Sequence, residues 1–269
     1  MIIDFHTHIF PDKIAQKTVD YLSNLGGLPA HTNGTLTDLC TKLEKAGVER
    51  SIALPVLTAP HQFDSVLSFT QTVNAQFSEG KHGVLSFAGI HPLCDDLEGK
   101  MAQIKSLGYK GVKIHPDYQG VFFDDERYIK ILTLAKEHDL IVVTHAGVDI
   151  GFRDKPVRCT PDRVLRALEK VSGVKLVLAH YGASEMEDEV YEKLAGLPVY
   201  FDTAFVLERI SKDKFLAIAQ KHGYDKILFA TDSPWKNIKN QVEIIKSYGL
   251  SKENQDKIFY KNALELLGE

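Results

Sequence analysis

The sequence predicts an α/β protein, a single-domain (β/α)8 TIM barrel that spans residues 1–269. Short β-branched runs alternate with amphipathic helical patterns from one end of the chain to the other, which is typical of repeated βα units around a parallel sheet. Eight such runs can be counted, and the length of 269 residues is near the roughly 250 that eight units need. No Gly-x-Gly-x-x-Gly or P-loop pattern is present, which disfavours an open, doubly wound sheet.

The eight expected strands are Ile2–His8, Ser51–Leu57, Val84–His91, Gly111–His115, Leu140–His145, Val174–His180, Val199–Thr203 and Ile227–Asp232. Helical segments between them carry Leu, Ile and Ala at i, i+3 and i+4, and we expect these segments to form the outer ring. The clearest are Thr37–Ala46, Asp125–His138, Pro161–Lys170, Lys212–His222 and Asn240–Tyr248. Segments 11–34 and 149–160 are too long for tight turns and are predicted to lie over the active-site face.

The composition is that of an ordinary globular protein. Hydrophobic residues make up 44% and charged residues 25%, which is enough apolar material for a large core. A net charge of -4 provides no broad basic surface, so nucleic-acid binding is not expected. Cys40, Cys94 and Cys159 are too few and too scattered for a disulfide framework, and no secretion signal or membrane span is visible. These features predict a soluble, cytoplasmic protein without a membrane partner. They leave open whether the protein forms a homodimer.

Metal-capable side chains stand at the C-terminal ends of six of the eight expected strands. They are His6, His8, His91, His115, His145, His180 and Asp232. In a parallel barrel all these strand ends open on one face, so residues far apart in sequence converge there. Barrel-lining positions normally hold Val, Ile or Leu, and buried imidazoles and carboxylates are costly unless they are paired or bind a metal. The pattern therefore predicts a metal site in the mouth of the barrel.

The first expected strand carries two of these residues in the motif His-x-His. His6 and His8 are two positions apart, so on a strand both project to the same side. We expect that side to be the barrel interior, while Phe5 and Thr7 face the helices. Two imidazoles in this arrangement can bind one ion.

Two further strand ends complete the expected site. His145 and Asp232 would bring it to three nitrogens and one oxygen, with a position left for water or substrate, as in a catalytic zinc site. Such an ion lowers the pKa of its bound water towards about 7 and polarises a carbonyl. His180 would then act as general acid or base. One divalent ion is expected, with zinc as the first choice, although manganese, iron, cobalt and nickel fit the same ligands.

Four sequence motifs resemble the amidohydrolase superfamily, and within it the amidohydrolase-2 branch of aminocarboxymuconate-semialdehyde-decarboxylase-like proteins. The motifs are Asp-Phe-His-Thr-His, Thr-His-Ala-Gly, Ala-His-Tyr-Gly and Ala-Thr-Asp-Ser-Pro-Trp. The ordered set runs from position 6 to 232, so the resemblance covers the whole barrel. It implies His6, His8, His145 and Asp232 as ligands, usually of zinc, and His180 as the base or activator. Members divide between hydrolysis of C–N or C–O bonds and non-oxidative decarboxylation, and the motifs do not separate the two.

Lys113 and His115 on the fourth expected strand would point inward together. In other amidohydrolases a carboxylated lysine at this place bridges two metals, and the fifth- and sixth-strand histidines serve the second ion. Two ions are therefore an alternative if Lys113 is carboxylated, with His180 as a further ligand. Otherwise Lys113 lines the barrel and pairs with Asp232 or a substrate carboxylate. His115, followed by Pro116, resembles a common fourth-strand ending of the amidohydrolase-2 group and is expected to contact substrate.

Substrate-binding residues are expected on the loops after the strands. Arg153 and Arg158 follow the fifth strand. A guanidinium group binds a carboxylate or phosphate through two parallel hydrogen bonds, so a small anionic substrate fits this loop. A solvated loop is the alternative. Tyr181 and Trp235 would form an aromatic wall for the substrate or pack beneath a loop. His91 completes the set.

These features predict a metal-dependent hydrolase for a small carboxylated amide, ester or lactone. Asp232 would take the proton of a metal-activated water, and His180 would steady the oxyanion. The first alternative is a metal-dependent decarboxylase, in which His180 or Asp232 delivers a proton to carbon. Further alternatives are a phosphoesterase, a non-catalytic binding barrel and a TatD-like deoxyribonuclease. The nuclease is disfavoured because the fourth strand lacks the glutamate ligand of those enzymes.

Overall fold

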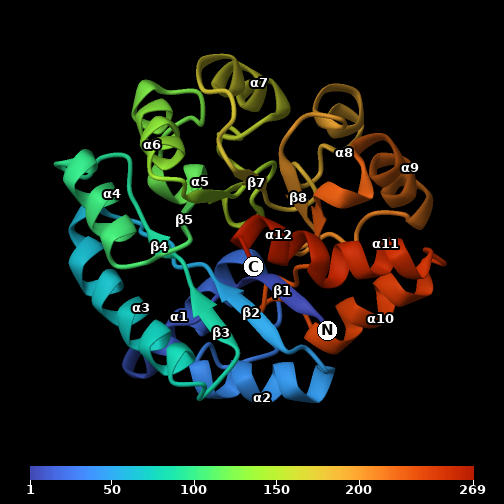
Figure 1. Ribbon diagram of the computed structural model, residues 1–269, viewed down its shortest axis with the longest axis horizontal. Coiled ribbons are helices and arrows are strands. Elements are labelled where there is room, and N and C mark those ends of the chain that lie inside the picture. Colours follow the sequence, from blue (N-terminus) through green and yellow to red (C-terminus); the bar gives the residue numbers. More distant parts are fainter.

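The computed structural model describes residues 1–269 and shows a barrel of parallel strands inside a ring of helices (Figure 1). The strands are β1 (Ile3–Thr7), β2 (Arg50–Ala53), β3 (Val84–Ser86), β4 (Ala88–Gly89), β5 (Gly111–Ile114), β6 (Ile141–Thr144), β7 (Leu176–Leu178), β8 (Tyr200–Asp202) and β9 (Ile227–Leu228). Neighbours pair in the orders β1-β2-β3 and β4-β5-β6-β7-β8-β9. The barrel predicted from the alternation of strand and helix patterns is confirmed.

The longer helices are α1 (Asp12–Gly26), α2 (Leu36–Ala46), α3 (Phe63–Ser78), α4 (Leu97–Ser106), α6 (Glu126–Glu137), α7 (Pro161–Lys170), α9 (Lys212–His222) and α10 (Ile238–Ser247). Side-chain caps explain where the five expected helices begin. Thr35, Asp125, Thr160, Ser211 and Asn237 each accept a hydrogen bond from a backbone N–H of the first turn. None of the helices combines the length and the apolar character that a membrane span requires.

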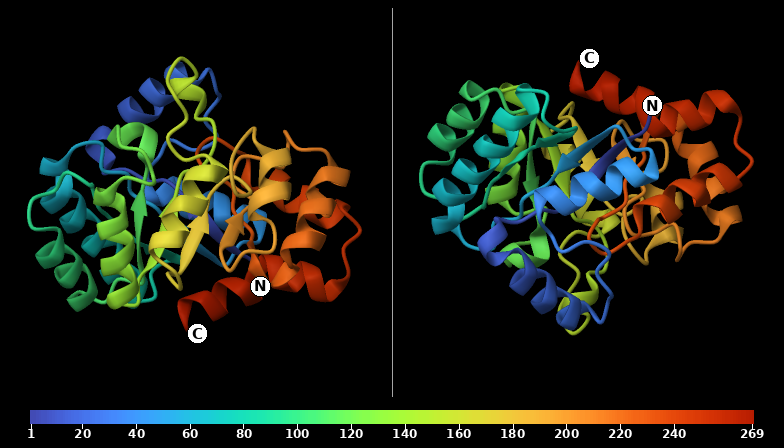
Figure 2. Two further views of the ribbon diagram at one scale, coloured as in Figure 1. Left: turned by 90° about the horizontal axis from the view of Figure 1, so that it is seen from above. Right: turned by 90° about the horizontal axis from the view of Figure 1, so that it is seen from below.

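Shorter helical segments fill the connections. They are α5 (Pro116–Gln119), α8 (Glu187–Glu189), α11 (Lys252–Asp256), α12 (Asn262–Leu267), the 3-10 turns η1 (Pro60–Gln62), η2 (Ile150–Phe152) and η4 (Tyr224–Lys226), and the π-helical turns η3 (Val190–Leu194) and η5 (Lys257–Lys261). Two of them border the site. α5 follows β5, and η2 lies in the loop after β6, where it contacts α1. Figure 2 shows α1 and the η2 loop together at the end of the barrel opposite the two chain termini.

The third expected strand is divided into β3 and β4. Phe87, between them, still donates its backbone N–H to Ala53 at 3.0 Å, and Gly89 pairs with Lys113 on β5, so the wall of the barrel continues. The barrel closes between the first strand and the last. The N–H of Phe5 donates to the carbonyl of Phe229 at 2.8 Å, and similar bonds join the next residues of these segments. Eight strand positions therefore form one closed wall.

Phe5 does not face the helices as predicted. It packs edge-to-face on Phe87, with 5.9 Å between ring centroids, in a buried cluster that also contains Leu266 and Leu267 of α12. The pairing of β1 with β2 shifts register between Asp4 and Thr7, and a bulge of this kind breaks the strict alternation of side chains. Phe5 therefore joins the core at the end of the barrel that α12 covers.

His222 provides a measurable pH dependence of stability. Its ring stacks on Phe201 with centroids 3.7 Å apart, and its Nδ1 accepts the N–H of Gly196. Burial lowers the pKa of His222 to about 4. The folded protein therefore keeps this imidazole neutral while the unfolded chain protonates it near pH 6.5, so the contribution is complete above pH 6.5 and is lost as the pH falls towards 4.

Between pH 7.5 and 4.5 we expect the free energy of unfolding to fall by about 2 kcal/mol more in the wild type than in His222→Phe, which keeps the stacked ring without the titrating group. Urea unfolding at both pH values measures this difference. Equal losses in the two proteins would show that His222 does not titrate differently on unfolding.

Candidate metal centre

Three ligand atoms converge at the C-terminal end of β1. The Nε2 atoms of His6 and His8 lie 3.2 Å apart. The Oδ1 atom of Asp232 lies 3.1 Å from Nε2 of His8 and 3.4 Å from Nε2 of His6. His6 is buried, and the side chains of His8 and Asp232 are only 15% and 10% exposed, so little water reaches this group.

The far nitrogen of each imidazole fixes its tautomer. Nδ1 of His6 lies 2.8 Å from Oδ2 of Asp202, and Nδ1 of His8 lies 2.8 Å from the carbonyl oxygen of Leu54. Both oxygens are acceptors, so both Nδ1 atoms carry a hydrogen and both neutral rings present a lone pair at Nε2. Two imidazole lone pairs and a carboxylate oxygen therefore face one another.

Such a convergence requires a cation. Lys113 donates one hydrogen bond to Nε2 of His6, with Nζ 3.1 Å away, but the lone pairs of His8 and Asp232 still face each other. Only a metal ion, or an added proton shared by these two groups, resolves this contact. Burial raises the pKa of Asp232, yet its close contact with His8 and the neighbouring imidazoles of His6 and His180 outweigh burial, and the pKa lies well below its ordinary value. Two imidazoles and an ionised carboxylate are a donor set that fits a divalent ion.

Asp202 supports this group and was not predicted. It ends β8, where its Oδ1 accepts the backbone N–H of His180 at 2.9 Å and of Ala204 at 3.1 Å, while its Oδ2 accepts from His6. A carboxylate behind a metal-binding imidazole fixes the orientation of the ring and raises its basicity. The signal was present in the sequence, because Asp202 stands at a strand end like the predicted ligands.

His145 does not join the tight group. Its Nδ1 lies 2.9 Å from Nε2 of His180, and the His180 ring stands 5.6 Å from that of His6. Nδ1 of His180 lies 3.0 Å from the carbonyl oxygen of Ala204, so it carries a hydrogen and Nε2 faces the site with a lone pair. The backbone of His180 and of Asp232 has positive φ values of 60° and 66°, and this uncommon conformation at a strand end directs both side chains into the mouth.

A second group of potential ligands contains His115, His145 and Asp149. Nδ1 of His115 accepts the N–H of Tyr118 at 3.5 Å, so its proton is on Nε2, which faces Oδ2 of Asp149 at 3.4 Å. His115 also stacks on His145 with centroids 4.3 Å apart. Each nitrogen of His115 therefore faces a group of the opposite kind, an N–H donor at Nδ1 and a carboxylate acceptor at Nε2, so this group does not require a cation.

The residues expected to bind substrate differ in their burial and in their partners. Trp235 is half-buried, and its backbone N–H donates to the backbone carbonyl of Asp232. His91 is buried, and its Nδ1 accepts the backbone N–H of Leu93. Arg153 is half-exposed and forms two hydrogen bonds with Glu185.

Tyr181 forms no wall of the mouth. Its ring stacks on Phe215 at 4.5 Å and its hydroxyl donates to the Phe215 carbonyl, because the chain turns sharply at His180 and Tyr181, both with φ of 60°. This position contributes to the core, which corrects the expectation from the sequence.

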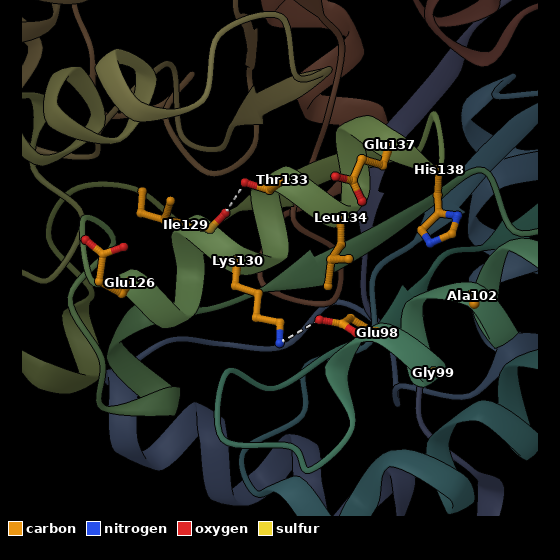
Figure 3. A pocket seen from close by; sticks show the side chains of 10 residues that line it. All are labelled: Glu98, Gly99, Ala102, Glu126, Ile129, Lys130, Thr133, Leu134, Glu137 and His138. Atoms are coloured by element: carbon orange, nitrogen blue, oxygen red, sulfur yellow. Dashed lines mark hydrogen bonds and ion pairs between the residues drawn. The ribbon is translucent and has the colours of Figure 1, made fainter.

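A hollow on the outer surface lies between α4 and α6, away from the strand ends (Figure 3). Its lining includes the ion pair of Lys130 with Glu98, at 3.0 Å, and the further acids Glu126 and Glu137. The exposed ion pair and the solvated acids are typical of a groove between neighbouring surface helices.

Comparison with known proteins agrees with the fold. The sequence model of the family described as Amidohydrolase matches residues 3–268. No curated protein matches the sequence. Among solved structures, a 2,6-dihydroxybenzoate decarboxylase in complex with 2,6-dihydroxybenzoate has a TM-score of 0.72 at 15% identity and covers 100% of this chain and 99% of its own.

Two further structures are similar. A dihydroxybenzoic acid decarboxylase from Polaromonas sp. JS666, with bound manganese and 2-nitroresorcinol, has a TM-score of 0.70 at 15% identity, with 99% of this chain and 96% of that chain covered. The 5-carboxyvanillate decarboxylase of Sphingomonas paucimobilis has a TM-score of 0.69 at 14% identity, with 99% and 98% covered. At these identities the likeness concerns the fold.

Proposed function

As the chain belongs to the amidohydrolase family, whose members are metal-dependent enzymes, we propose that it binds a divalent ion at His6, His8 and Asp232 and decarboxylates a small carboxylated substrate. One observation supports the metal site. The ligand atoms of these three residues lie within 3.4 Å of one another, and the acceptors at Nδ1 of His6 and His8 fix the tautomers of both rings. The decarboxylases among the similar folds support this reaction at least as well as the hydrolysis that the sequence favoured.

His145 is the proposed further ligand, through Nδ1. Zinc is the first choice, and manganese, which one similar structure holds, fits the same donors. In a two-ion variant of the site, the second ion would be held by Nδ1 of His145 and Nε2 of His180, which lie 2.9 Å apart. Burial lowers the pKa of Lys113 to about 8, although the negative charges of Asp202 and Asp232 act to raise it. A larger share of neutral amine favours carboxylation of this lysine, which the two-ion variant requires.

The residues of the mouth can perform the proposed reaction. The ion, when bound, supplies positive charge that holds the substrate and stabilises developing negative charge. Lys113 adds a buried cation on the same side. His180 is placed to move the proton, because Nδ1 is held by the Ala204 carbonyl and Nε2 faces the mouth. The bond between carbon and carboxyl group breaks, carbon dioxide leaves, and the electron pair on carbon takes a proton from Nε2 of a protonated His180.

Hydrolysis is the second candidate, favoured by one observation. The carboxylate of Asp232 stands in the converging group, with Oδ1 3.1 Å from Nε2 of His8 and 3.4 Å from Nε2 of His6, so it would lie beside a water bound there and could take its proton. The two reactions release different products. Protein loaded with zinc or manganese is incubated with phenolic and aliphatic carboxylates and with carboxylated lactones and amides, and released carbon dioxide is measured beside released acid.

Carbon dioxide in proportion to substrate loss supports decarboxylation. Acid without carbon dioxide supports hydrolysis and overturns the first proposal. No turnover of any compound, together with no binding of divalent ions, would overturn the metalloenzyme.

Substitution of His180 tests its role as proton carrier. In His180→Asn we expect kcat to fall about 10²- to 10⁴-fold, which is the usual contribution of a general acid or base. Metal content should stay close to that of the wild type under the one-ion arrangement, because the three converging ligands are intact. Steady-state kinetics with the best substrate of the panel measure the loss. An unchanged kcat would remove His180 from the reaction.

A further inference from the structure

Three buried polar atoms beside the metal centre have no hydrogen-bond partner. They are Oδ2 of Asp117, Nε2 of His145 and Nη1 of Arg158. They belong to one group: Nε2 of His145 lies 3.8 Å from Oδ2 of Asp117, and Nη1 of Arg158 lies 3.6 Å from Oδ1 of the same carboxylate. The side chain of Asp117 is 3% exposed and that of His145 is 7% exposed. Buried polar groups without a partner destabilise the folded state, so their proximity indicates an arrangement that completes these bonds.

The tautomer of His145 decides which arrangement is formed. With the proton on Nδ1, the ring donates to Nε2 of His180 but turns a lone pair towards the carboxylate of Asp117. With the proton on Nε2, the ring turns an N–H towards Oδ2 of Asp117, 3.8 Å away, and presents a lone pair at Nδ1. The second tautomer leaves the Nδ1 and Nε2 lone pairs of the two histidines face to face, and a bound cation removes that repulsion. Only this tautomer satisfies Asp117 and ligates metal at the same time.

We propose, on the basis of the function proposed above, that Asp117 is a positioning residue that holds His145 with Nε2 protonated and Nδ1 turned to the metal ion. Arg158 fixes the carboxylate from its other oxygen. The pair then repeats on β6 what Asp202 and His6 do on β1, a carboxylate behind a metal-binding imidazole. The guanidinium of Arg158, predicted to bind substrate, is directed to Asp117 in this arrangement.

The fold places Asp117 for this role. His115 caps α5 with its side chain, and Pro116 opens the helix, so Asp117 is held in the first turn of α5, directly after the strand. Asp149 provides an internal comparison. It is also a buried carboxylate beside the stacked pair of His115 and His145, but its Oδ2 faces the protonated Nε2 of His115, which is not a proposed metal ligand.

Metal affinity is the first test. Zinc binding is measured by competition with a chromophoric chelator for the wild type, Asp117→Asn and the matched control Asp149→Asn. We expect Asp117→Asn to weaken zinc binding about 10-fold or more, as removal of an orienting carboxylate typically does, and Asp149→Asn to change it less than about 2-fold. Near-ultraviolet circular dichroism of each protein, and rescue towards wild-type affinity by Asp117→Glu, separate positioning from misfolding.

The tautomer itself is the second test and is measured on the wild-type protein. Long-range ¹H–¹⁵N spectra of histidine side chains are recorded on zinc-loaded wild type, with His145 assigned by its loss in His145→Gln. A protonated Nε2 and an unprotonated Nδ1 are the expected result. A proton on Nδ1, or equal zinc affinity of Asp117→Asn and wild type, would overturn the inference and leave the metal site intact. Failure of the wild type to bind any divalent ion would instead overturn the proposed function, and the inference with it.

Discussion

Replacement of His8 by alanine is expected to abolish metal binding and, with it, turnover. The variant removes one of the three donors that converge in the structure, so an ion would keep only His6, Asp232 and His145, which stands outside the tight group. Elemental analysis of protein purified without added ions should find about one ion per wild-type chain and about a tenth of that or less in His8→Ala. Turnover should fall at least about 10³-fold, since the chemistry depends on the ion.

His61→Ala is the matched control, because His61 is exposed and lies on the 3-10 turn η1. It should keep the wild-type metal content. About two ions per wild-type chain would favour the variant with carboxylated Lys113 and a second ion between His145 and His180. An equal metal content in His8→Ala and the wild type would refute the site.

Replacement of Asp202 by asparagine is expected to damage both the metal site and the stability of the fold. The Asn oxygen can still accept the N–H groups of His180 and Ala204, but its amide then points N–H groups at Nδ1 of His6, which also carries a hydrogen. His6 must turn or exchange its tautomer, which moves the lone pair away from the ion. Metal affinity should fall about 10- to 100-fold, and the metal-free protein should lose about 1–3 kcal/mol.

Chelator competition and urea unfolding of the metal-free protein measure the two effects of Asp202→Asn. The matched control is Asp4→Asn. Asp4 is equally buried, but it accepts hydrogen bonds from the backbone of His6 and from the backbone and hydroxyl of Thr231, and from no imidazole. It should lower stability and leave metal affinity within about 3-fold of the wild type. An equal loss of affinity in both variants would show that burial, not orientation of His6, is what Asp202 provides.

The barrel was predictable because its signals are local and periodic. Most strands are short apolar runs, and most of the longer helices have an apolar stripe and a capping residue such as Thr160. The break at Phe87 and the bulge that turns Phe5 into the core were not predictable. Both depend on how one strand registers against its neighbours, and a register is a property of the pair of strands.

Part of the candidate site followed from chain order alone. His6, His8 and Asp232 were expected together because parallel strands open on one face, and the structure does place them together. The same rule would have included Asp202. The loops could not be assigned in this way: Arg153 is bound to Glu185, and Tyr181 lies against Phe215 because of the backbone turn at the strand end.

The sequence by itself determined the architecture, the residue types at the mouth and the family to which they point. The tertiary structure decided which nitrogen of each imidazole faces the mouth of the barrel. That choice depends on the acceptor behind each ring: Asp202 for His6, the Leu54 carbonyl for His8 and the Ala204 carbonyl for His180. These partners are far from the histidines in sequence or belong to the backbone. No residue pattern encodes their distances, because only the closed barrel brings them within 3 Å of the rings.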